Sequence, residues 1–158
     1  MVKYRNRIYN FEIDLPKGWR YPSIIMRLLR KDKNPEFYGP KGESLKFAIG
    51  KIFYEPSLEE QQKNLERIAQ MYDHEVVEIG SINVCGKEHA TMICRIPFVK
   101  MFPAIINQSS PYLFRRISFI TLKNYSIILK GLEYLATADL QGFQEKEYDD
   151  IIKTFRLV

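Results

Sequence analysis

The chain has 158 residues, a length that suits one domain and lets about 70% of the unfolded surface be buried without disulfides or metals. Apolar residues make up 46% and charged residues 27%, which is ordinary for a globular protein and excludes a disordered or fibrous chain. The net charge of +5 comes from short basic clusters, which favours a solvated basic face and argues against a nucleic-acid partner.

Signals for secretion and membrane insertion are missing from the sequence. The first residues lack the apolar stretch of a signal peptide, and no segment approaches the roughly 20 apolar residues of a membrane span. Cys94 is predicted within a strand, opposite residues near Ile79, and Cys85 at the tip of the preceding turn, which is too far for a disulfide. We therefore expect two reduced thiols in a soluble, cytoplasmic protein without a membrane partner.

The first predicted element is a strand over residues 8–15, where apolar and polar side chains alternate. Pro16 ends this strand, and Gly18 turns the chain onto its only tryptophan. The side chains expected to enter the core from this region are Phe11, Ile13, Leu15 and Trp19.

The next region is ambiguous. Residues 20–32 have apolar side chains at helical spacing and Pro22 suits a first helical turn, so we favour a short helix, although the same residues could form a buried strand. Residues 33–44 are predicted to be a loop because they contain two prolines and two glycines. A second strand follows and ends near Pro56, with one apolar face formed by Leu45, Phe47 and Ile49.

The clearest local signal is a capping box at the start of a helix over residues 57–72. The Ser57 hydroxyl is expected to accept from the Glu60 amide, and the Glu60 carboxylate from the Ser57 amide. Glu59 and Lys63 form a favourable pair one turn apart on the exposed side. The predicted apolar stripe consists of Leu58, Leu65, Ile68 and Tyr72.

Two β-hairpins are predicted next, the first around Gly86 and the second around Lys123 and Asn124. Their strands are expected at residues 76–84, 88–96, 116–122 and 125–135. One strand of the second hairpin is apolar on both faces, which predicts a sheet covered on both sides. Its alternating apolar side chains are Ile117, Phe119, Ile120 and Leu122.

A helix over residues 143–155 is predicted to close the chain. Acidic residues lie towards its start and basic residues towards its end, as the helix dipole favours. Its apolar stripe, at positions i, i+3, i+4 and i+7, consists of Tyr148, Ile151, Ile152 and Phe155.

This order of elements and three short motifs resemble the PsbP-like family. The motifs are the Phe-Glu-Ile-Asp-Leu-Pro-Lys-Gly-Trp strand at 11–19, the Phe-Tyr-Gly-Pro-Lys-Gly turn at 37–42, and the Ile-Ile-Lys-Thr-Phe helix end at 151–155. The resemblance implies an α+β fold, an α/β/α sandwich with a mostly antiparallel sheet of about six or seven strands and two or three helices. It also implies that residues 1–158 form a single PsbP-like domain.

The family is diverse in function. It includes a photosystem II subunit, a nuclear-import factor that binds the Ran GTPase, bacterial lipoproteins and chaperones of secreted effectors, most of which bind proteins and are not enzymes. The resemblance therefore implies a non-catalytic protein-binding module, an adaptor or a chaperone-like protein, that acts on a protein partner and needs no cofactor.

The sequence departs from the family pattern at residues 97–114, a long connection with three prolines that is too apolar for a plain surface loop. One interpretation is a flap that covers an open sheet face; another is a partner-binding or homodimer surface. A third makes the segment a lid over an aromatic pocket that contains His89 or Tyr112, in a small-ligand-binding or enzymatic domain. The candidate partner-binding residues are Phe98, Met101, Phe102, Ile105, Ile106, Tyr112, Phe114 and Arg115.

Candidates for catalysis or metal binding are few. His74 lies just past the first helix, where a cationic side chain suits the dipole, and His89 is expected as a cross-strand partner in the first hairpin. A Cys/His pair is conceivable, but Cys94 suits the core better. The neighbouring carboxylates of Asp149 and Asp150 point apart on a helix, so we expect a solvated face and no catalytic pair there. We expect neither a catalytic residue nor a metal ligand.

Overall fold

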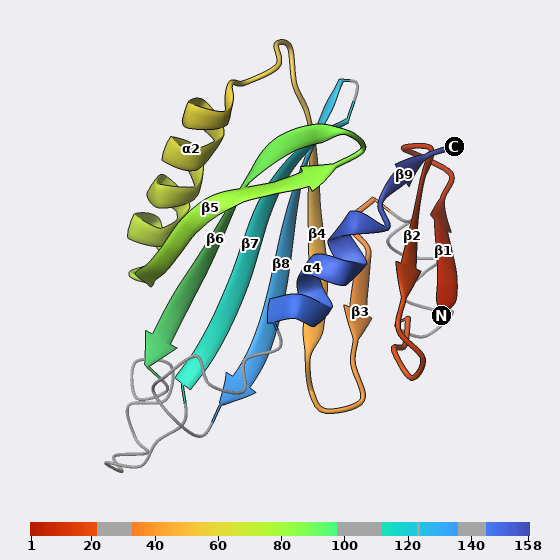
Figure 1. Cartoon of the computed structure of the whole chain (residues 1–158), viewed down its shortest axis with the longest axis horizontal. Coiled ribbons are helices and arrows are strands. Elements are labelled where there is room, and N and C mark those ends of the chain that lie inside the picture. The colour runs from red at the N-terminus through yellow and green to blue at the C-terminus, as the bar shows by residue number, and fades with distance from the viewer. Residues whose placement is uncertain (22–32, 98–111, 123, 136–144) are drawn as a thin grey trace.

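The computed structural model describes residues 1–21, 33–97, 112–122, 124–135 and 145–158, which form a six-stranded sheet, a three-stranded sheet and two helices (Figure 1). All strand pairs are antiparallel, which confirms the expected α+β class. The larger sheet has the order β3 (Glu36–Tyr38), β4 (Ser44–Lys51), β8 (Tyr125–Leu135), β7 (Tyr112–Leu122), β6 (Lys87–Pro97) and β5 (Glu75–Val84). The smaller sheet has the order β1 (Val2–Asn6), β2 (Phe11–Leu15) and β9 (Arg156–Leu157).

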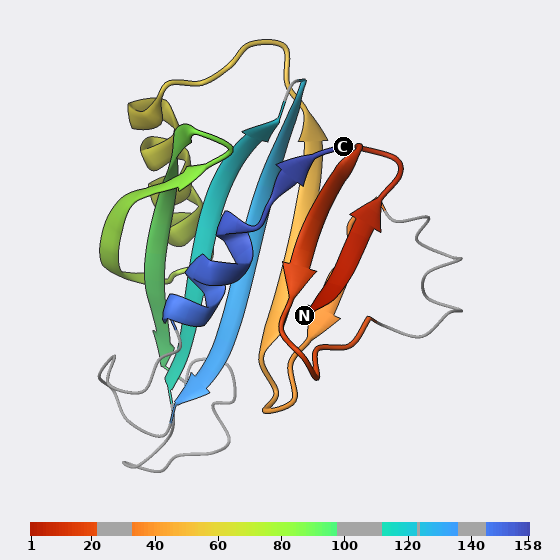
Figure 2. The same ribbon diagram turned by 45° about the vertical axis from the view of Figure 1, so that its right-hand side comes forward.

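The larger sheet is covered on both faces, as the apolar pattern of residues 116–122 predicted. Helix α2 (Leu58–Met71) lies on one face, and α4 (Glu145–Lys153) with the smaller sheet lies on the other (Figures 1 and 2). Ile117 and Phe119 of β7 belong to the core on the α2 side, whereas Ile120 and Leu122 belong to the core on the α4 side. One outer layer of the sandwich is therefore a helix, and the other combines a helix with a small sheet.

The helices predicted over residues 57–72 and 143–155 are confirmed as α2 and α4. The capping box at Ser57 starts α2, with the Glu60 amide 3.2 Å from the Ser57 hydroxyl and the Ser57 amide 2.8 Å from the Glu60 carboxylate. Leu65 is buried as predicted, but Tyr72 is 56% exposed, because the helix ends at Met71 and Tyr72 serves as its C-cap. The place of an apolar residue in the stripe is taken by Gln61, which is buried and accepts a hydrogen bond from the backbone amide of β6 at Ala90 (2.9 Å).

Three strands were not predicted. Strand β1 pairs with β2 although only Tyr4 and the polar Asn6 of its five side chains are buried. Strand β3 lies inside the predicted loop 33–44, and the two-residue β9 follows α4. The first predicted strand is also shorter than expected, because residues 7–10 form a turn with Asn10 at φ 54°.

The two predicted hairpins are confirmed and lie side by side, because β6 and β7 pair with each other from Ala90–Phe119 to Pro97–Tyr112. Cys94 lies opposite Val76 and not near Ile79, since the turn is at Cys85–Gly86 and a bulge shifts the register between Val76 and Glu78. Both thiols are free, as expected.

For residues 20–32 the sequence favours a short helix, with a buried strand as the alternative. Arg20 forms a β-bridge with Tyr38, with hydrogen bonds of 2.8 and 3.0 Å, and residues 22–32 lie outside the described residues.

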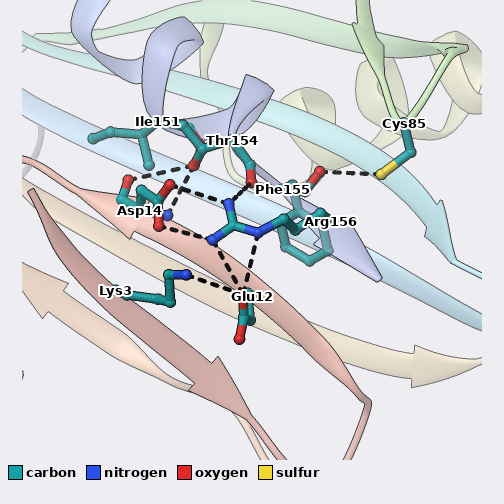
Figure 3. Close-up of polar contacts among 8 residues, drawn as sticks. All are labelled: Lys3, Glu12, Asp14, Cys85, Ile151, Thr154, Phe155 and Arg156. Atoms are coloured by element: carbon teal, nitrogen blue, oxygen red, sulfur yellow. Dashed lines mark hydrogen bonds and ion pairs between the residues drawn. The ribbon is translucent and has the colours of Figure 1, made fainter. Parts of the chain in front are cut away.

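The C-terminal end of α4 is tied to the smaller sheet by Arg156 (Figure 3). Its guanidinium group donates to both carboxylate oxygens of Asp14 (3.0 and 3.1 Å) and to Glu12 (3.1 Å). The Thr154 hydroxyl accepts from the Asp14 amide at 2.9 Å, and the Cys85 thiol donates to the Phe155 carbonyl at 3.0 Å. These contacts join β2, residues 154–156 at the end of the chain, and the β5–β6 turn at one point.

Gly131 of β8 is required by the packing of α4. The ring of Tyr148, 1% exposed, lies directly on this glycine, so a Cβ atom there would be 2.6 and 2.7 Å from two ring carbons. We expect Gly131→Ala to destabilise the protein by about 1–3 kcal/mol, the usual cost of overpacking. Urea unfolding would measure this. Gly80→Ala in β5 is the control, because nothing lies within 4 Å of the added Cβ atom; equal stability of the two variants would contradict the prediction.

Asp14 should contribute to stability in a pH-dependent way. The hydrogen bonds from Arg156 lower the pKa of Asp14 below its ordinary value of 3.8. Its contribution is therefore present above that value and is lost as the pH falls through the lower pKa of the folded state. We expect Asp14→Asn to lower the free energy of unfolding at neutral pH, and to weaken its decline in acid. Unfolding curves at a series of acidic pH values test this, with Asp150→Asn as the control; identical pH profiles of wild type and Asp14→Asn would refute it.

Candidate functional site

Helix α2 covers only part of the sheet face on which it lies, and basic side chains lie on that face beyond the helix. The strand register shows this along one row of paired residues: Met92 on β6, Ile117 on β7, Lys130 on β8 and Lys46 on β4. Met92 and Ile117 are completely buried in the core beneath α2. The two lysines continue the same row beyond the helix, so the row changes from apolar to cationic where the helix cover ends.

A pocket of about 230 Å³ opens at this boundary; we call it the basic pocket. Its lining residues are Ser44, Lys46, Tyr72, Arg115 and Lys130. Three strands contribute through neighbouring register positions, since Arg115 and Ser44 both pair with Leu132 of β8. Tyr72 comes from the C-cap of α2, and the Lys130 ammonium lies 5.6 Å from the centre of its ring, a cation–π contact.

The charges of the basic pocket are only partly compensated. Lys46 forms an ion pair with Glu36 at 2.7 Å. Among the described residues, no carboxylate pairs with Arg115 or Lys130. Burial lowers the pKa of Arg115, and burial together with the charges of Arg115 and Lys46 lowers the pKa of Lys130. The pocket therefore concentrates positive charge in a place where water solvates it poorly.

The positive charge of the pocket also affects the protonation of His74. Burial, followed by the charges of Arg115 and Lys130, lowers the pKa of His74 to about 4, so the imidazole is neutral at pH 7. The expectation that His74 is cationic at the helix end is therefore wrong. Burial and the two nearby cations disfavour the imidazolium more than the helix dipole favours it. Its Nδ1 is buried without a hydrogen-bond partner in the described part of the chain, and its ring centre lies 5.8 Å from that of Tyr72.

Only some of the partner-binding residues predicted from the sequence lie among the residues that the structure describes. Phe98, Met101, Phe102, Ile105 and Ile106 lie outside the described residues. Tyr112 begins β7, and its side chain is likewise outside the description. Phe114 is 1% exposed, so its ring belongs to the interior, whereas Arg115 lines the basic pocket.

The ends of segment 97–114 lie near the basic pocket. Pro97 pairs with Tyr112, so the connection 98–111 leaves and re-enters the sheet at one place. Arg115 is three residues from Tyr112 along β7, which corresponds to about 10 Å. The described ends of the predicted segment, Pro97 and Tyr112, therefore lie at the same end of the sheet as the basic pocket.

Lys46, Lys130, Ser44 and Tyr72 were not predicted as site residues. Alternation along residues 44–51 does place Lys46 on the face opposite Phe47. What brings it beside Lys130 is the pairing of β4 with β8, whose positions are more than 80 residues apart in the chain.

The candidates for catalysis have structural roles in the described residues. His89 is 1% exposed, and its Nδ1 accepts from the Thr121 amide at 3.3 Å. Burial raises the pKa of the Cys94 thiol to about 11, which makes it a poor nucleophile at pH 7. Asp149 does not lie on a purely solvated face, because it pairs with the buried Arg116 at 2.9 Å. No group of three potential metal ligands is found within the described ranges.

A larger cleft, of about 430 Å³, lies between α4 and the first strands. Its carboxylates already have partners: Asp14 with Arg156, Glu147 with the Trp19 indole (3.2 Å), and Asp150 with Lys146 (3.0 Å). It therefore offers less unsatisfied charge for recognition than the smaller basic pocket.

Comparison with known proteins defines the fold. No family model and no curated protein sequence matches the chain. Among solved structures, the cyanobacterial PsbP protein of Synechocystis matches with a TM-score of 0.64 at 12% identity, over 99% of this chain and 92% of that one. The Ran-binding protein Mog1p of Saccharomyces cerevisiae matches with a TM-score of 0.62 at 10% identity, over 99% of this chain and 95% of that one.

The protein thus has an α+β fold with a mostly antiparallel sheet, and this fold is the one that PsbP and Mog1 share. The resemblance to the PsbP-like family that the three motifs predicted is confirmed at the level of the fold. Of the helices in the described ranges, none has the length and apolar character to cross a membrane.

The coupling between His74 and the basic pocket can be measured directly. Arg115→Gln and Lys130→Gln should each raise the pKa of His74 above about 4, since each removes a positive charge that disfavours the imidazolium. NMR titration of the imidazole protons gives this pKa. Lys153→Gln, on the exposed side of α4, is the matched control and should leave it unchanged. An unchanged pKa in both pocket variants would mean that these cations do not face His74.

Proposed function

We propose that the protein is a non-catalytic protein-binding module, an adaptor or chaperone-like protein of the cytoplasm. Its partner docks on the basic half of the α2 sheet face and on the adjoining segment 97–114. The fold supports this, since one protein of the same fold, Mog1p, is a Ran-binding protein. Within the described residues, the groups that catalysis would need, notably His89 and Cys94, are buried and have structural roles.

The observation that carries the proposal is the incomplete charge compensation of the basic pocket. Arg115 and Lys130 are half-buried, and no described carboxylate pairs with either of them. A cation held away from water gains more from an acidic partner than a fully hydrated surface lysine does. The partner surface that fits is therefore acidic at this point.

The predicted segment supplies the apolar part of the same surface. Its candidate residues Phe98, Met101, Phe102, Ile105 and Ile106 are aromatic, aliphatic or thioether side chains, the types that dominate the centres of protein interfaces. An apolar centre beside a basic rim is the common arrangement of a binding surface. A homodimer is an alternative occupant of the segment, and light scattering of the purified chain distinguishes it from a heterologous partner.

Charge reversal of the basic pocket tests the proposal. Wild-type protein serves as bait in the source cells, captured proteins are identified by mass spectrometry, and their affinities are measured with purified components. We expect the Arg115→Glu/Lys130→Glu variant to bind the partner at least tenfold more weakly, because two attractive charges become repulsive. Lys146→Glu/Lys153→Glu on α4 makes the same change in net charge on the opposite layer and should bind as the wild type does.

The segment is tested separately with Phe102→Ser/Ile106→Ser. Circular dichroism and urea unfolding first establish that each variant folds. Loss of binding in both variants supports one continuous surface. Wild-type affinity in the charge-reversed pocket variant would contradict the proposed docking face, and wild-type affinity in the segment variant would leave the segment as a structural cover.

A further inference from the structure

We infer that the basic pocket binds a doubly charged oxyanion, and that its occupant is a phosphate monoester on a side chain of the protein partner. This inference rests on the proposed function, because it names the chemical group that the partner presents to the pocket. It is carried by the number of uncompensated charges, the kinds of donor and the size of the pocket.

The charge count matches a dianion. Among the described residues, three cations line the pocket, Lys46, Arg115 and Lys130, and one carboxylate, that of Glu36, pairs with Lys46, so two of these positive charges have no described counter-charge. A phosphorylated side chain carries about −1.5 to −2 charges at pH 7. A single carboxylate would neutralise only one of the two.

The donors also suit phosphate. The guanidinium group of Arg115 presents a planar fork that binds two oxygens at once, and the ammonium group of Lys130 acts as a point charge. Ser44 and Tyr72 line the same pocket, and a hydroxyl group is a donor that suits a third oxygen. A volume of about 230 Å³ accommodates a phosphate group, with the chain that carries it leaving through the open side.

The strand register places like charges next to each other in this cluster, which destabilises the sheet unless an anion binds there. Lys46 and Lys130 lie directly opposite each other on β4 and β8, and like charges in opposite positions destabilise a sheet. Several other cations in the described residues, unlike Arg115 and Lys130, have carboxylate partners. These ion pairs are Arg116 with Asp149, Arg95 with Glu75, Lys87 with Glu55, and Arg156 with Asp14.

The first experiment titrates the full-length chain with inorganic phosphate and with O-phosphoserine, at constant ionic strength set by chloride. NMR signals of the Arg115 and Lys130 backbone amides and of the His74 ring report on the pocket. We expect a saturable change with a millimolar dissociation constant, and a rise in the pKa of His74 because a bound anion offsets the charges of Arg115 and Lys130 that lower it. Asp73 also faces His74 and already raises its pKa, so the rise adds to that effect.

Variants locate the binding. Arg115→Gln and Lys130→Gln should each weaken phosphate binding at least tenfold, whereas Lys153→Gln should leave it unchanged. Arg115→Lys, which keeps the charge and loses the fork, should fall between the wild type and Arg115→Gln. Changes that do not saturate, or that chloride alone reproduces, or that persist in Arg115→Gln, would overturn the anion site.

The second experiment identifies the source of the phosphate and separates this inference from the proposed function. The captured partner is treated with phosphatase, which should weaken its binding at least tenfold. If charge reversal of the pocket weakens partner binding while phosphatase has no effect, the docking face stands and the phosphate inference fails. If phosphate binds the pocket but pocket variants bind the partner normally, the docking face and the partner-borne phosphate both fail.

Discussion

The packing of this protein depends on a sheet whose two faces must both be buried. One face is covered by α2 alone, and the other by α4 together with the smaller sheet. Strand β7 has Ile117 and Phe119 on one face and Ile120 and Leu122 on the other, all nearly inaccessible. On one side, the α2 helix of 14 residues spans about 21 Å and packs against β5, β6 and β7. The strands β8 and β4 extend the sheet beyond it, so their outward residues on that face are free to be polar. The basic pocket lies at this boundary.

The opposite face is covered by pieces from both ends of the chain. Tyr148 of α4 rests on the bare backbone of Gly131, and the rings of Phe11 and Phe155 stack with centres 4.4 Å apart. Arg156 then fixes the end of the chain to β2 through Asp14 and Glu12. The Leu-Pro-Lys-Gly-Trp stretch belongs to this cover, since Leu15 and Trp19 are 3% and 6% exposed. Leu15 and Trp19 therefore serve as core side chains of the scaffold.

Elements specified by neighbouring residues could be predicted from the sequence. The capping box at Ser57, the turn at Gly86 and the spacing of Tyr148, Ile151 and Ile152 depend on contacts within a few residues. Strands β1 and β9 could not be predicted, because Val2–Asn6 is mostly polar and Arg156–Leu157 is only two residues long. Both are strands only because β2 lies between them.

The candidate site shows the same limit. Arg115 was predicted as a partner-binding residue next to the apolar segment, but its real neighbours are set by the register of β4, β8 and β7. No local pattern places Lys46 opposite Lys130, since the pairing joins residues far apart in the chain. Composition could reveal a mildly basic protein, and only the fold could show that the positive charge is concentrated in one pocket.

The local energetics suggest why such a cluster persists. Like charges directly opposite each other, such as Lys46 and Lys130, destabilise a sheet, and one acidic substitution at either position would remove this penalty. Burial adds a desolvation cost for Arg115 and Lys130, whose pKa values are both lowered. Burial of His74, together with the charges of Arg115 and Lys130, keeps its imidazole neutral at pH 7. The Lys130 contact with Tyr72 offsets part of the cost without neutralising any charge. A structural role would be served equally well by a salt bridge like that of Arg116 and Asp149, and this contrast between the two sites, drawn within the described residues, is what supports the proposed acidic partner.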